Sequence, residues 1–146
     1  PFMDFDLALL KNVDVLVVNE TELAGVLEML DAPKLDEADA VSWLSDKFGN
    51  TVVATLGSRG AISVAAGSMT TVPSLKIKPV DTVGAGDTFV GYLSAGLAEG
   101  MTLSSAMERA SVAAGLACLT PGAQPSIPER AAVEDRLALG VASEAQ

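Results

Sequence analysis

The stretch that decides the fold reads Asp81-Thr82-Val83-Gly84-Ala85-Gly86-Asp87-Thr88-Phe89. Two glycines in three residues are followed by a carboxylate and by apolar residues at helical spacing. This pattern predicts a loop that turns into a helix whose first backbone amides are free. Free amides at a helix N-terminus bind anions well. Asp87 is therefore either the catalytic carboxylate of an anion site or only the acidic first turn of an ordinary helix.

The catalytic interpretation has a physical basis in phosphoryl transfer. Glycines at positions 84 and 86 let a polyphosphate approach the backbone, and the amides stabilise negative charge on a transferring phosphoryl group. A carboxylate beside that group can accept the proton of an attacking hydroxyl. A glycine turn with an aspartate in the first helical turn is also a common way to start a helix. Local physics alone leaves both interpretations open.

The rest of the chain alternates strands with helices. Apolar, valine-rich runs predict strands over residues 13–18 and 51–56, and a hairpin joins shorter strands over 61–65 and 69–72. Helical spacing predicts helices over 6–12, 19–30, 38–48, 85–99, 102–119 and 128–139. The expected fold class is α/β, a layered α/β/α domain with a mostly parallel sheet, and residues 1–146 are expected to form one domain.

Unusual residues follow three of the predicted extended segments, at Asn19, Gly57 and Asp81. Ligands of such sheets bind beyond the carboxyl ends of the strands, so these residues are expected to converge on one edge. Asn19 and Glu22 have the spacing of a capping box, and they could equally hold Mg²⁺ through water and phosphate oxygens. Residues 55–60 form a glycine-containing turn that is a weak signal by itself.

Composition excludes several kinds of function. The formal net charge of −10 argues against nucleic acid as a partner, because binding it needs a basic surface. The absence of histidine excludes His-based triads and His-ligated zinc. The apolar runs are too short to cross a bilayer, and the first residues lack the basic start of a secretory signal, so we expect a cytoplasmic protein without a membrane partner. Cys118 is expected in the buried core.

Two glycines, Gly91 and Gly96, lie inside the helix that follows Asp87. Glycine in a helix interior costs about 1 kcal/mol relative to alanine. We therefore expect another backbone or helix to pack closely against both positions.

Taken together, four stretches resemble the ribokinase family of pfkB-type sugar kinases. Residues 81–89 resemble the family's C-terminal signature, which is specific. The other three stretches appear in family order and read Val18-Asn19-Glu20-Thr21-Glu22, Thr55-Leu56-Gly57-Ser58-Arg59-Gly60 and Gly122-Ala123-Gln124-Pro125-Ser126-Ile127-Pro128. The last two favour the ribokinase branch of the family.

The resemblance implies a role for each motif in an ATP-dependent kinase that phosphorylates a primary hydroxyl of a small, ribose-like sugar. Asp87 would be the catalytic base, and Gly84, Ala85 and Gly86 would form the anion hole. Asn19 and Glu22 would belong to the Mg²⁺-phosphate motif. The residues implied to line the ATP site are Thr55, Gly57, Ser58 and Gly60. A monovalent cation such as K⁺ would be held by the side chains of Asp81 and Ser126 and by the carbonyls of Val83, Ala117, Thr120 and Gly122.

The chain departs from the family in length. Family members are about twice as long, and their N-terminal half carries a glycine-pair motif, most sugar-binding side chains and a β lid. This chain resembles the C-terminal half only, so we expect it to pair with the missing half or with itself, and to be poorly active or inactive alone. A non-catalytic nucleotide-binding or assembly module is the alternative function.

Overall fold

The computed structural model describes residues 6–140, and the chain divides into two compact units. The first unit comprises Pro1–Leu56 and Ile62–Thr71, and the second comprises Gly57–Ala61 and Val72–Gln146. That the whole chain forms one domain stays a prediction.

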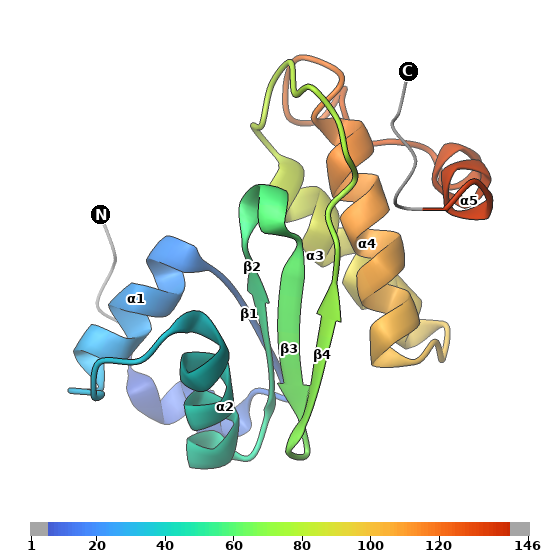
Figure 1. Cartoon of the computed structure of the whole chain (residues 1–146). Coiled ribbons are helices and arrows are strands. Elements are labelled where there is room, and N and C mark those ends of the chain that lie inside the picture. The colour runs from blue at the N-terminus through green and yellow to red at the C-terminus, as the bar shows by residue number, and fades with distance from the viewer. Residues whose placement is uncertain (1–5, 141–146) are drawn as a thin grey trace. The chain divides into compact units, whose positions relative to one another are not determined.

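A four-stranded sheet with the strand order β1-β2-β3-β4 organises the first unit. Strand β1 (Val15–Asn19) pairs in parallel with β2 (Thr51–Thr55), with Asn19 opposite Thr55. Strands β3 (Ala61–Ala65) and β4 (Ser68–Val72) run in opposite directions, as Figure 1 shows, and form the predicted hairpin. The expected α/β class is confirmed, while the sheet is mixed because its last two strands are joined by a tight turn.

Three helical segments complete the first unit: the 3-10 helix η1 (Leu7–Asn12), α1 (Glu20–Met29) and α2 (Glu37–Phe48). Each begins at a side-chain cap, and Gly49 ends α2 with a left-handed φ of 70°. The apolar faces of α1 and α2 share one core with the sheet. Its buried members are Leu10, Val18, Leu23, Val26, Ala40, Val41, Leu44, Val52, Ala54, Ile62 and Val64.

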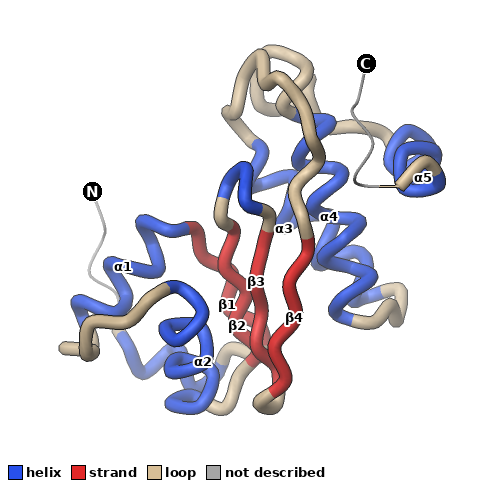
Figure 2. The backbone as a smooth tube through the Cα atoms, viewed as in Figure 1, coloured by secondary structure: helices blue, strands red, loops and turns tan. Residues whose placement is uncertain are grey.

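The second unit contains the short 3-10 helix η2 (Gly57–Arg59) and the helices α3 (Ala85–Ala98), α4 (Leu103–Ala117) and α5 (Arg130–Ala138). Helices α3 and α4 lie side by side (Figures 1 and 2). No helix in the described part of the chain is both long and apolar enough to cross a bilayer.

The two helical glycines of α3 have different surroundings. A Cβ built at Gly96 lies 3.0 Å from the Cβ of Ala106 in α4, so the predicted close packing is confirmed there. A Cβ built at Gly91 meets no atom within 4 Å, and the prediction of close packing is wrong at that position within this chain.

A buried arginine of α4 contacts residues at the end of α3 and in α5. Arg109 of α4 is 3% exposed, and its Nη1 donates to Glu99 Oε2 at 2.9 Å. Its Nε lies 3.4 Å from Glu134 Oε1 of α5, and its guanidinium lies over the Tyr92 ring. Arg130 donates to the same Glu99 carboxylate at 3.0 and 3.2 Å. The hydrogen bond from Arg109, aided by the charges of both arginines, lowers the pKa of Glu99.

Acid should weaken this network. Because the pKa of Glu99 is lower in the folded chain than its ordinary value of 4.5, its stabilising effect is complete at neutral pH and is lost as pH falls through the folded pKa. We expect Glu99→Gln to lower the free energy of unfolding at pH 7 and to change it much less near pH 3. Urea denaturation at both pH values measures this. The control is Glu108→Gln at an exposed position of α4, and an equal effect of Glu99→Gln at both pH values would contradict the account.

Candidate functional site

The first turn of α3 has the free amides that the sequence predicts. Gly84 is the N-cap residue with φ 79°, and no side chain caps the helix. The amide of Ala85 donates to Thr82 O at 3.3 Å, and that of Thr88 donates to Gly84 O at 2.9 Å. Within the described residues, the amides of Gly86 and Asp87 have no acceptor. These two donors lie at the positive end of the helix dipole and can receive an anion.

Asp87 lies on the same first turn, and its side chain is exposed. It borders a hollow of about 310 Å³ that follows α3 and is also lined by Gly91, Tyr92 and Ile127. The carboxylate therefore stands beside the free amides and faces open space. A carboxylate in this position can accept a proton from a group bound beside the helix start.

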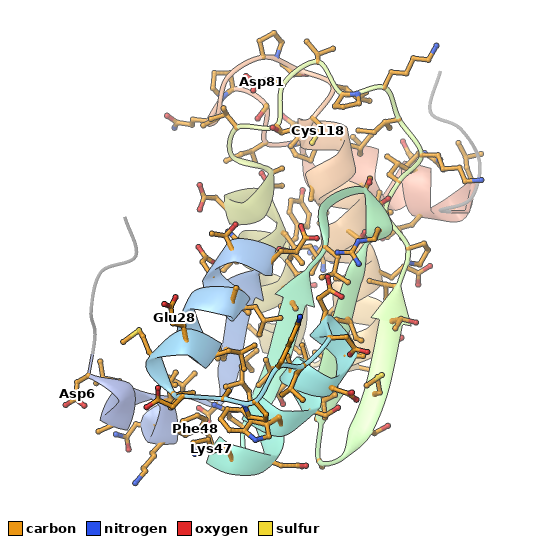
Figure 3. The ribbon with its side chains drawn as sticks, turned by 60° about the vertical axis from the view of Figure 1, so that its left-hand side comes forward. Asp6, Glu28, Lys47, Phe48, Asp81 and Cys118 are labelled. Atoms are coloured by element: carbon orange, nitrogen blue, oxygen red, sulfur yellow. The ribbon has the colours of Figure 1, made fainter. Side chains whose placement is uncertain are left out.

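Two loops meet at the start of α3, and Asp81 joins them. Asp81 Oδ2 accepts a hydrogen bond from the amide of Gly122 at 2.9 Å, and Oδ1 accepts one from Val83 at 3.0 Å. The amides of Val80 and Asp81 donate to Cys118 O at 2.8 and 3.2 Å, and Figure 3 shows Asp81 and Cys118 close together. The amide of Gly122, followed by that of Val83, lowers the pKa of Asp81.

The loop after α4 also packs against the glycine turn. A Cβ at Gly84 would lie 3.0 Å from the Cα of Ala123, so this position needs glycine for space as well as for its positive φ. Ser126 is buried, and its hydroxyl donates to Ala123 O at 2.8 Å. The amide of Thr120 donates to Ala117 O at 3.3 Å. The residues expected to hold a monovalent cation thus all belong to these two loops of the second unit or to the end of α4.

Cys118 corrects one expectation, because it is partly exposed and does not belong to the buried core. It is the C-cap residue that follows the last helical residue of α4, Ala117. Partial burial, followed by the nearby negative charge of Asp81, raises the pKa of its thiol.

Asn19 and Glu22 form the capping box that their spacing predicts. Asn19 Oδ1 accepts from the amide of Glu22 at 2.9 Å, and Glu22 Oε2 accepts from the amide of Asn19 at 2.9 Å. Thr55 lies beside Asn19 in the sheet register. These residues belong to the first unit, whereas Gly57 and Asp87 belong to the second. The convergence of the motifs on one edge therefore stays a prediction.

Removing the cap should destabilise α1. We expect Asn19→Ala to lower the free energy of unfolding by about 1 kcal/mol, because the amide of Glu22 loses its acceptor. Urea denaturation measures the loss. Asp36→Ala is a matched control, since Asp36 Oδ1 caps α2 at the same distance of 2.9 Å from the amide of Asp39. A much smaller loss for Asn19→Ala than for Asp36→Ala would contradict this role.

Two contacts of the glycine-containing turn are not evident from its sequence. Gly60 has φ 94°, and a Cβ there would overlap the carbonyl oxygen of Val72. The hydroxyl of Ser74 donates to the carbonyl of Ser58. Val72 is the last residue of β4 and Ser74 follows it, and no spacing rule connects either residue with the turn. The turn is thus fixed by the chain that leads towards Asp81.

The chain is similar to known proteins in both sequence and structure. Residues 1–130 match the model of the pfkB family of carbohydrate kinases. The chain is 33% identical over 137 residues to a ribokinase of Lactococcus lactis, covering 94% of this chain and 43% of that protein. The crystal structure of Thermotoga maritima ribokinase superposes with a TM-score of 0.83 at 30% identity, covering 88% of this chain and 43% of that one.

A third relative was solved with ribose and ATP bound. The structure of Arabidopsis thaliana ribokinase complexed with ribose and ATP superposes with a TM-score of 0.78 at 32% identity, covering 88% of this chain and 42% of that one. The chain therefore spans less than half of the length of these relatives. The superpositions confirm the ribokinase-like fold expected from the sequence.

Proposed function

Because the chain belongs to the pfkB family of carbohydrate kinases, we propose that it supplies the ATP site, the anion hole and the catalytic base for phosphorylation of a sugar. The acceptor is the primary hydroxyl of a ribose-like sugar, in keeping with the ribose and ATP bound to the Arabidopsis relative. One observation carries the proposal. The uncapped first turn of α3 places two free amides beside the exposed carboxylate of Asp87.

The reaction is an in-line displacement at the γ-phosphorus of ATP. The sugar hydroxyl oxygen forms the new bond to phosphorus while the bond to the β,γ-bridging oxygen breaks and ADP leaves. Asp87 accepts the hydroxyl proton. Gly84, Ala85 and Gly86 form the anion hole. Within this turn, the free amides of Gly86 and of the adjacent Asp87 donate to the oxygens of the transferring group, where negative charge must be stabilised.

The nucleotide is held by residues at the ends of β1 and β2 and in the turn that follows. Thr55, Gly57, Ser58 and Gly60 line the ATP, and Asn19 and Glu22 face the metal-bound phosphates. Of the two Glu22 carboxylate oxygens, Oε2 accepts from the amide of Asn19, while Oε1 has no partner in the described part of the chain and can accept from a water bound to Mg²⁺. No cluster of three or more acidic, histidine or cysteine side chains occurs in the described part of the chain. Mg²⁺, which supplies charge neutralisation when bound, would take most ligands from phosphate and water.

All the ligand atoms expected around the cation near Asp81 are oxygens, and oxygen ligands suit a monovalent cation such as K⁺. The Asp81 carboxylate keeps lone pairs beyond those that Val83 and Gly122 use, and the Ser126 hydroxyl donates its proton and so keeps its own lone pairs. The carbonyls of Val83, Ala117, Thr120 and Gly122 complete the set. These groups would hold a K⁺ ion, which would supply positive charge beside the anion hole.

The test uses the chain completed by the portion of the Lactococcus lactis relative that it does not cover. We expect ribose-dependent release of ADP by the completed protein, and little or none by the 146 residues alone. Robust ribose phosphorylation by the 146-residue chain alone would contradict the proposal that the complete site also needs the portion this chain does not span. A completed, folded protein that binds ATP without releasing ADP would contradict the proposed activity.

A non-catalytic nucleotide-binding or assembly module is the second candidate, and the short length favours it, since the chain spans 43% of the Lactococcus lactis relative. The intact glycine turn and Asp87 argue against it. Calorimetry with Mg-ATP followed by the ADP-release assay separates the two functions. A non-catalytic module would bind the nucleotide in both the 146-residue chain and the completed protein, and neither would release ADP.

A further inference from the structure

Residues 73–81, which we call the connecting segment, lead from β4 towards the glycine turn and run alongside α4 (Figure 1). They belong to no helix or strand, so no regular backbone hydrogen bonding of their own holds them. Their position must come from groups on their neighbours. The connecting segment, α4 and the turn at residues 57–60 all belong to the second compact unit.

Two positions of α4 hold the start of the connecting segment. Ser111 is 6% exposed, and its hydroxyl donates to the carbonyl oxygen of Pro73 at 2.7 Å. One helical turn later, a Cβ built at Gly115 would lie 2.6 Å from the Cβ of Leu75, which is itself buried. A Cβ is fixed to the backbone and cannot rotate away, so any side chain at position 115 would displace residue 75. Glycine is a poor helix former, and here close packing explains its use.

The end of the connecting segment is held where α4 ends. The amides of Val80 and Asp81 both donate to the carbonyl oxygen of Cys118. Ser111, Gly115 and Cys118 are separated by four and three positions, which is the spacing of one helix face. The segment therefore lies along one face of α4, and this face fixes its two ends relative to each other.

The connecting segment contacts two parts of the proposed site. At its start, the hydroxyl of Ser74 donates to the carbonyl of Ser58, and the backbone of residues 72 and 73 closes the space beside Gly60. Ser58 and Gly60 belong to the turn proposed to line the ATP. At its end, Asp81 begins the loop that leads to the free amides of α3. One stretch of chain thus joins the nucleotide turn to the anion hole.

We propose that Ser111 and Gly115 are positioning residues for phosphoryl transfer: they seat the connecting segment on α4, and the segment holds the ATP-lining turn and the start of the anion-hole loop in place. The inference rests on the proposed function, because it takes residues 57–60 as part of the ATP site. When the segment leaves α4, Ser74 no longer reaches Ser58. Only molecules with the segment in place then bind the nucleotide at full affinity, so loss of a contact on α4 weakens the measured affinity.

The test compares two serine variants of the ¹⁵N-labelled 146-residue chain. Ser111→Ala removes the hydrogen bond to Pro73, and Ser45→Ala removes one of the same length, 2.7 Å, from a similarly buried serine of α2 to the carbonyl of Asn50. Urea denaturation should show similar losses of stability. In a titration with Mg-ATP followed by nuclear magnetic resonance, we expect affinity about fivefold weaker in Ser111→Ala, the factor that corresponds to one lost hydrogen bond, and a change of less than about twofold in Ser45→Ala.

Gly115→Ala tests the other contact by adding an atom. Alanine is a better helix former than glycine, so at an open helix position it would raise stability. Here its Cβ must displace Leu75, and we expect Mg-ATP affinity at least about tenfold weaker than that of wild type. Circular dichroism verifies that the variant is folded, and Ser111→Ala tests the proposal independently of this variant.

Hydrogen exchange of the nucleotide-free chain adds a readout by position. The amide of Gly60 donates to Gly57 within the turn, and those of Val80 and Asp81 donate to the end of α4. These three amides should exchange faster in both α4 variants than in wild type and should be unchanged in the α2 variant. A purely structural role of Ser111 would not single out these amides.

Unchanged Mg-ATP affinity in Ser111→Ala would overturn the proposal, whatever its exchange rates. Equal weakening by Ser111→Ala and Ser45→Ala would also overturn it, because the effect would then follow stability alone. A wild-type chain that does not bind Mg-ATP contradicts the proposed function instead. In that case the exchange rates of the nucleotide-free chain decide whether the two α4 residues position the segment, and rates equal to those of wild type would refute that role.

Discussion

Asp87→Asn should lower the kcat of the completed kinase by about 10²–10⁴-fold, the usual contribution of a positioned general base. The amide side chain has the same shape but cannot accept the sugar proton. Asp87 makes no side-chain hydrogen bond within the described residues, so the variant should still fold, with a loss of at most about 1 kcal/mol from the removed charge in the first turn of α3. Steady-state release of ADP with ribose and Mg-ATP measures the effect.

The matched control is Asp135→Asn, which makes the same change at an exposed position of α5 and should leave kcat unaltered. Affinity for Mg-ATP should change only a few-fold in Asp87→Asn, because the amides of the helix start remain. A kcat that stays within about threefold of wild type would remove Asp87 as the base, whatever the affinity, since loss of general-base catalysis has a far larger effect.

Gly60→Ala should destabilise the chain by about 3 kcal/mol or more. Gly60 has φ 94°, and its Cβ would overlap Val72 O and lie 2.8 Å from the carbonyl carbon of Pro73. Both are backbone atoms, which cannot rotate away as a side chain can. Urea denaturation followed by circular dichroism measures the loss.

Gly57→Ala provides the control in the same turn. Its φ of 54° is also positive, but a Cβ there meets nothing within 4 Å. We expect it to cost only about 1 kcal/mol, the strain of a left-handed alanine. Equal losses at the two positions would show that strain alone, and not the contact with the backbone of residues 72 and 73, makes glycine necessary at position 60.

Local signals in the sequence predict the elements of this fold well. The capping box of Asn19 and Glu22, the acidic start of α2 and the uncapped glycine start of α3 each depend on residues within one helical turn. Their ends differ from the expected ranges by only one or two residues. Such features need no knowledge of the rest of the chain, because the interacting groups are neighbours in sequence.

Contacts between distant segments could not be predicted in this way. Asp81 and Gly122 are 41 residues apart, and no local rule shows that a carboxylate on one loop accepts from an amide on the other. The helical glycines show the same limit. Gly91 and Gly96 read alike in the sequence, yet only Gly96 contacts another helix of this chain. Cys118 is partly exposed and caps the C-terminus of α4, and the apolar run around it in the sequence does not show where that helix ends.

Nuclear magnetic resonance of the ¹⁵N-labelled 146-residue chain, titrated with Mg-ATP, tests the central claim most directly. The claim is that the free amides at the start of α3 receive the phosphates. We predict that the amide resonances of Gly86 and Asp87 shift most strongly and saturate together with those of Gly57 and Ser58, even if binding is weak. Nucleotide-dependent shifts elsewhere with Gly86 and Asp87 unmoved at saturation would contradict the account.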